Sequence, residues 1–145
     1  MRRLIIVLAL CIGVANQAIG ASEKRCSRDE AIAAETEMAT IRDWGSVYRS
    51  FKQYAQCDDA GIGEGYSESI ARLLTEDWKH FYTLNKLALK NRDFEKFVLH
   101  HVDELMTPDQ EKKIYENTRL RCPAKAKRLC KLIETRLDET KPVAK

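Results

Sequence analysis

Residues 43–55 read DWGSVYRSFKQYA and contain the clearest helical pattern in the chain. Their apolar side chains are spaced by three or four residues, so they fall on one face of a helix. These side chains are Trp44, Val47, Tyr48, Phe51, Tyr54 and Ala55. Asp43 stands directly before them, where its carboxylate can accept hydrogen bonds from the free amides of a first helical turn. The stretch therefore predicts an amphipathic helix that packs against a core.

Similar spacing recurs on both sides of this stretch, and no convincing alternating strand pattern interrupts it. Ser27 and Glu30 form a capping box that starts a helix before it. Thr107 and Pro108 start another helix after it, with threonine as the cap and proline at the first helical position. Further apolar stripes begin at Ala31, Ile70, Phe94 and Ala126. We therefore expect an all-α fold, a single disulfide-stapled domain of about five to seven helices in antiparallel hairpins.

The main interruption is at residues 57–65, which read CDDAGIGEG. Three glycines at alternate positions disfavour a helix, and Asp58 and Asp59 suit turns and caps. We expect a flexible loop here, with helix resuming near Tyr66. Residues 66–90 then form one long helix or two helices with a kink.

The first twenty residues have the layout of a cleavable signal peptide. Arg2 and Arg3 precede an uncharged, mostly apolar run, and the small residues Ala18 and Gly20 follow it. The run is too short to span a hydrocarbon core of about 30 Å. Cys11 lies inside the run, which argues against a lipid-bearing cysteine at a cleavage site. We expect cleavage after residue 20 and a periplasmic or secreted protein.

Without residues 1–20, residues 21–139 are predicted to form one helical domain, and residues 140–145 a disordered tail. The chain then carries 23 Lys+Arg against 22 Asp+Glu, with the acids in excess before residue 119 and the bases in excess after it. The basic end contains Lys125, Lys127, Arg128, Lys131 and Arg136. We favour a solvated helix face for these residues, with an anionic membrane surface or an acidic partner as the alternative.

Four cysteines remain beyond the leader: Cys26, Cys57, Cys122 and Cys130. An oxidising compartment favours disulfides, and three pairings are possible. A helical hairpin that turns near Asp43 brings Cys26 close to Cys57, so we prefer the pairs Cys26–Cys57 and Cys122–Cys130. The alternative ties both N-terminal cysteines to the C-terminal pair. None of the spacings suits zinc, and we expect no metal or other cofactor.

Functional motifs are scarce. The chain contains no nucleophile motif, no zinc-binding HExxH sequence and no phosphate-binding glycine loop. We therefore expect a non-enzymatic protein that binds another protein and no nucleic acid. In this hypothesis Asp58, Asp59, Glu64 and Tyr66 enter a cationic or polar cleft on the partner, as in an inhibitor or a toxin-neutralising immunity protein.

Two alternatives use the same carboxylates. A small hydrolase would pair them with His80, which requires a concave pocket that joins the histidine to the loop. A weak calcium site would use three of them together. Of the other histidines, His101 lies on an apolar stripe and is predicted to be a hydrogen-bonded core or boundary residue, whereas His100 is predicted to lie in solvent.

Overall fold

The computed structural model describes residues 25–103 and 105–140. The predicted signal peptide and residues 141–145 of the predicted tail lie outside these ranges. Within them the chain forms seven α-helices and no strand, which confirms the all-α prediction. The helices are α1 (Arg28–Met38), α2 (Trp44–Tyr54), α3 (Ala60–Glu76), α4 (Phe81–Lys90), α5 (Arg92–His100), α6 (Pro108–Leu120) and α7 (Lys127–Glu139). Short 3-10 turns precede three of them: η1 (Ala55–Cys57) before α3, η2 (Trp78–His80) before α4 and η3 (Ala124–Ala126) before α7.

The predicted helix starts are confirmed by their caps. Ser27, Asp43 and Thr107 each accept the backbone amide of the third helical residue, whose side chain bonds back to the cap amide. The Asp43 carboxylate lies 2.7 Å from the amide nitrogen of Ser46. Hydrogen bonds from Ser46 hold the pKa of Asp43 below its usual value. These caps fix where α1, α2 and α6 begin, because they satisfy amides that have no partner within the helix.

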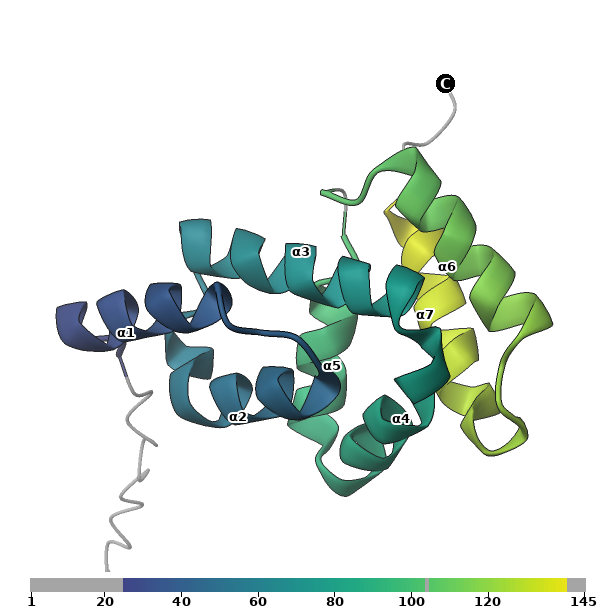
Figure 1. The fold of residues 1–145 in the computed structure, drawn as a ribbon, viewed down its shortest axis with the longest axis horizontal. Helices are drawn as coiled ribbons and strands as arrows, with labels where there is room; N and C mark the ends of the chain where they lie inside the picture. Colours follow the sequence, from purple (N-terminus) through teal and green to yellow (C-terminus); the bar gives the residue numbers. More distant parts are fainter. Residues whose placement is uncertain (1–24, 104, 141–145) are drawn as a thin grey trace, which may run out of the picture.

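Helix α3 organises the molecule. Figure 1 shows α1 beside the first half of α3, α2 below them, and α6 with α7 toward the other end of α3. The main core contains the inner faces of α2, α3, α4, α5, α6 and α7, and a smaller cluster of Ala34, Tyr54 and Cys57 lies under α1. The stripe predicted for residues 43–55 faces this interior: Trp44 and Val47 are buried, and Tyr48 and Phe51 pack partly buried against the core.

Both preferred disulfide pairs are present. The Cα atoms of Cys26 and Cys57 are 4.9 Å apart, and those of Cys122 and Cys130 are 6.3 Å apart. The first bridge joins the start of α1 to the end of η1, as the predicted hairpin requires. The second bridge folds the segment before α7 back onto that helix. Loop-closure entropy assigns about 3.7 kcal/mol to the first bridge and about 2.6 kcal/mol to the second.

The predicted loop at residues 57–65 is wrong, because α3 begins at Ala60 and includes all three glycines. A Cβ at Gly65 would lie 2.9 Å from Met38 Cγ, and a Cβ at Gly63 would lie 3.1 Å from Asp58 Oδ1. These glycines therefore allow close approach of α1 and of a carboxylate to α3. The close packing offsets the low helix propensity of glycine.

Candidate functional site

Tyr66 is a core residue and not a surface contact. Its side chain is fully buried, its hydroxyl lies 2.7 Å from Ser50 Oγ, and its ring packs edge-on against Phe97. Burial raises the pKa of Tyr66 to about 12. The expectation that Tyr66 meets a partner is therefore corrected. Tyr66 lies four residues before Ile70 on the apolar stripe of α3, so it falls on the inner face of the helix.

The two adjacent aspartates also have roles within the fold. Asp58 turns inward, and its Oδ2 lies 3.1 Å from Nε2 of His101. Only 17% of the Asp58 side chain is exposed, so most of this carboxylate is inaccessible to a partner. Asp59 is the N-cap of α3 and accepts the Ala60 amide at 2.8 Å, while the residue as a whole remains exposed. Of the four predicted contact residues, Asp59 and Glu64 lie on the surface.

A buried polar network extends from Asp58 through His101. Nδ1 of His101 lies 3.0 Å from Ser67 Oγ, and this hydroxyl donates to Asp103 Oδ2 at 2.6 Å. The other Asp103 oxygen accepts the Leu105 amide at 3.0 Å. Ser67 and His101 are 4% and 2% exposed. The network therefore ties the turn before α3 and the segment after α5 to the middle of α3.

His101 confirms the prediction of a hydrogen-bonded core histidine, and exposed His100 confirms the prediction for its neighbour. The partners of His101 were missed because Ser67 lies 34 residues away and Asp58 lies 43 residues away. One signal was present in the sequence: Ser67 lies three residues before Ile70, on the apolar stripe of α3. A polar side chain at such a position needs a buried partner.

The order of serine, histidine and aspartate invites comparison with a hydrolytic triad, but the hydrogen bonds differ. Nucleophilic catalysis requires the serine to pass its proton to the histidine and to present its oxygen to a substrate. Here the hydroxyl of Ser67 donates to Asp103, and the side chain is almost fully buried. The arrangement therefore braces the fold and does not present a nucleophile.

The hydrolase alternative built on His80 is not supported by the geometry. His80 Nδ1 lies 2.7 Å from Asp77 Oδ1, an exposed contact just beyond the end of α3. Asp58 and Glu64 lie at the start of that helix, and 17 helical residues separate the two ends by about 26 Å. The calcium alternative is also corrected: across residues 25–103 and 105–140, no three His, Cys, Asp or Glu side chains are placed to hold a metal.

The surface beside α3 contains a hollow of about 430 Å³ between this helix and the residues before α6. We call it the α3 hollow; its walls include Glu64, Glu68, Leu105, Met106 and Thr107. Glu64 and Glu68 are exposed and one helical turn apart, and Leu105 is 59% exposed. Glu68 also borders a second hollow, of about 240 Å³, between α1 and α3. The two glutamates thus form an acidic ridge next to an apolar side chain.

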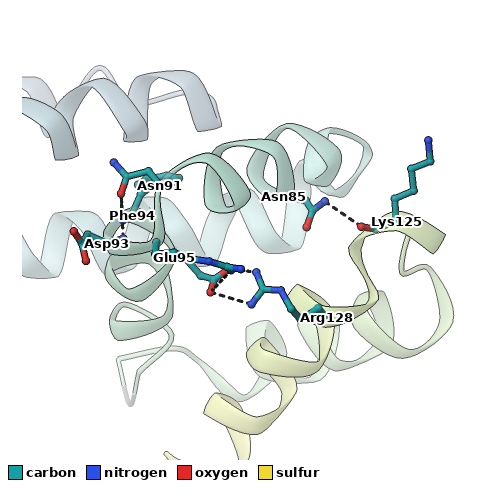
Figure 2. A network of polar contacts seen from close by, with 8 residues as sticks. Asn85, Asn91, Asp93, Phe94, Glu95, Lys125 and Arg128 are labelled. Carbon is teal, nitrogen blue, oxygen red and sulfur yellow. Dashed lines mark hydrogen bonds and ion pairs between the residues drawn. The ribbon is translucent and has the colours of Figure 1, made fainter.

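The basic residues near the C-terminus are largely balanced by partners within the chain. Figure 2 shows Arg128 of α7 reaching buried Glu95 of α5, with Nη1 3.0 Å from Oε1. Arg92 reaches the same carboxylate at 3.0 Å. Burial disfavours the ionised carboxylate, but the hydrogen bonds and charge of Arg128, reinforced by Arg92, outweigh it and lower the pKa of Glu95.

Two further basic side chains of α7 also contact the chain itself. Lys131 lies 3.8 Å from Glu134, and Arg136 donates to the Leu99 carbonyl at 3.3 Å and pairs with Glu139. In Figure 2 the Lys125 side chain extends away from the neighbouring helices, while its carbonyl accepts from Asn85 at 3.2 Å. Lys127 is exposed. This balance supports a solvated helix face more than a concentrated anion-binding surface.

In comparisons with known proteins, no family model, no curated protein and no solved structure matches the chain. The helices in the described part of the chain are too short or too polar to cross a membrane. The two disulfides are compatible with a periplasmic or secreted protein.

Proposed function

We propose that this protein is a small, exported, non-enzymatic binding protein whose docking surface is the acidic ridge and the α3 hollow. The observation that carries the proposal is the placement of exposed Glu64 and Glu68 beside exposed Leu105 at the rim of one hollow. The two carboxylates and the apolar side chain lie close together on the surface. Protein interfaces likewise combine an apolar centre with polar residues around it.

The chemistry of this surface favours a protein partner with a cationic patch. Carboxylates at the rim speed the encounter with a basic surface and select against acidic ones, while apolar contact at the centre contributes affinity. Leu105 supplies apolar contact, and Met106 contributes to the lining of the same hollow. A basic enzyme or toxin that is inhibited by this protein fits the proposal.

The scaffold supports such a role because the surface is held rigidly. Glu64 and Glu68 lie on a 17-residue helix whose inner face is buried, and the Cys26–Cys57 bridge holds the turn directly before that helix. A surface that is ordered before binding loses little conformational entropy in the complex.

The experiment that tests the proposal removes the two ridge charges without changing side-chain size. A partner is first captured from the envelope or culture medium of the source organism, identified and purified, and its affinity is then measured by calorimetry. The variant Glu64→Gln/Glu68→Gln should weaken binding at least 10-fold at low salt, with a smaller difference at high salt.

The matched control is Glu76→Gln/Asp93→Asn, which removes two exposed carboxylates at a distance from the hollow. It should bind like the wild type, within about 2-fold, because surface charges outside an interface contribute little. Equal affinity of the ridge variant and the control variant would overturn the proposal.

A further inference from the structure

We propose that His101 is a proton-dependent latch: as an imidazolium it ties the turn before α3 and the segment after α5 to α3, and loss of a proton releases one of these ties. The part of this inference that concerns partner binding rests on the proposed function, because the segment after α5 borders the α3 hollow. The latch itself does not depend on the identity of any partner.

The charge of the ring follows from the hydrogens that the network needs. Three contacts join four groups: His101 to Asp58, His101 to Ser67, and Ser67 to Asp103. A carboxylate that is ionised only accepts, so Nε2–H must donate to Asp58 and the serine hydroxyl must donate to Asp103. The Ser67 oxygen is then the acceptor for Nδ1–H. Both ring nitrogens of His101 therefore carry a hydrogen, and the ring is positively charged.

The surroundings of the ring balance this charge. The turn before α3 contributes the Asp58 carboxylate, and the segment after α5 contributes Asp103. Helix α3 contributes Ser67 and Tyr66, whose ring centroid lies 5.5 Å from that of His101. Tyr66 stays neutral at physiological pH because burial raises its pKa to about 12.

Another titratable neighbour is His100, at the end of α5 directly before His101. Its ring centroid lies 5.2 Å from that of His101, and its side chain is exposed to solvent. Two carboxylates thus face the buried imidazolium against one solvated histidine. A buried positive charge is tolerated when negative groups lie near it, and Asp58 and Asp103 supply them here.

A neutral imidazole leaves the network one hydrogen short. The ring then supplies one hydrogen and the serine supplies one, so only two of the three contacts can form. The contact that is lost is Asp58 to the ring, the ring to Ser67, or Ser67 to Asp103. In the proposed latch it is the contact from Ser67 to Asp103. Because Asp103 also accepts the amide of Leu105, loss of this contact frees the apolar rim of the α3 hollow.

The test measures the ring nitrogens and the neighbouring amides in the full oxidised chain. At pH 6, nitrogen NMR of the histidine rings should show both Nδ1 and Nε2 of His101 protonated. As the pH is raised until one of these protons is lost, amides 105–107 should lose at least 10-fold in hydrogen-exchange protection, after correction for the intrinsic pH dependence of exchange. A ring nitrogen without a proton at pH 6, or unchanged protection on deprotonation, would overturn the latch.

Two variants separate the latch from general stability. His100→Gln should keep the pH-dependent change in protection, and His101→Gln should abolish it. If His101→Gln does not fold, Asp103→Asn replaces it in the test, because asparagine preserves the shape of the aspartate side chain. In Asp103→Asn the second ring proton of His101 should be lost at a lower pH than in the wild type. The same pH of loss would contradict the latch. If the ring loses its proton as expected but partner affinity does not change with it, the latch stands and its effect on partner binding is refuted. The docking surface itself is tested separately by the variant Glu64→Gln/Glu68→Gln.

Discussion

Gly65 lies where α1 crosses α3, and a side chain there would meet Met38. The glycine is therefore a packing residue within a helix and not a point of flexibility. Gly61 has open space around its Cα, although it belongs to the same run of alternating glycines. The two positions differ in tertiary surroundings, which makes them a matched pair.

Alanine at these two positions should have opposite effects on stability. Gly61→Ala should raise the free energy of unfolding by about 0.5–1 kcal/mol, because alanine favours the helix. Gly65→Ala should lower it by about 1–2 kcal/mol, because the added methyl group pushes Met38 away from α3. Urea unfolding measures the free energy of unfolding of each variant and of the wild type. A stabilising Gly65→Ala would mean that α1 does not pack as closely as described.

At the scale of elements, Glu95 connects α5 to α7. Its side chain is 9% exposed, and Arg128 and Arg92 both contact its carboxylate. Arg128 is about half exposed, so water screens part of this interaction. The pair therefore holds the two helices in register with a modest gain in stability.

The variant Glu95→Gln should lower the free energy of unfolding at pH 7 by about 1–2 kcal/mol, because a hydrogen-bonded charge is replaced by a neutral amide. The pKa of Glu95 is lowered in the folded chain, so its contribution is fully present above the ordinary glutamate value of 4.5. That contribution is lost as the pH falls through the lower folded-state pKa. The stability difference between wild type and variant, followed by urea unfolding from pH 7 to pH 3, should shrink below pH 4.5. A difference that grows in acid would contradict the assigned ion pair.

The bridge between Cys26 and Cys57 acts on α1. Replacing both residues with serine should lower the free energy of unfolding by about 2–4 kcal/mol. It should also reduce hydrogen-exchange protection in α1 more than in α7, because the bridge anchors the start of α1. The control Cys122→Ser/Cys130→Ser should show the reverse pattern, since that bridge lies at α7. Equal loss of protection in both helices in each variant would argue against separate local roles.

Local sequence signals predicted the helices well where the deciding contacts lie within one turn. Ser27, Asp43 and Thr107 bond to residues three positions away, so their caps can be recognised in the sequence. The start of α3 could not be predicted in this way. Two of its glycines are required by Met38 and Asp58, and only the folded chain brings these side chains against them.

The candidate site was predicted only in part for the same reason. Glu64 remains on the surface, whereas Tyr66, four residues before Ile70, is buried on the inner face of α3. Glu68 and Leu105 border one hollow although 37 positions separate them, and no local pattern links them. Asp58 was recognised as a polar turn residue, but its partner His101 lies 43 residues away.

At the scale of the whole molecule, the two ends of the sequence differ in charge. Acidic residues exceed basic ones before residue 119, and the basic residues of α7 are largely paired with acids of the same chain. Glu64 and Glu68 form no ion pair with the described residues, and both line the α3 hollow. Glu68 also shares the hollow between α1 and α3 with Arg42 and Arg72. Partner recognition is therefore proposed for α3 and not for α7.

The most direct test of this placement is an NMR titration of the labelled protein with its purified partner. We predict that the largest shifts in amide signals occur at residues 64–71 and 105–110, the two segments that line the α3 hollow, with small shifts along α7. Shifts centred on residues 125–136, with α3 unchanged, would contradict this placement.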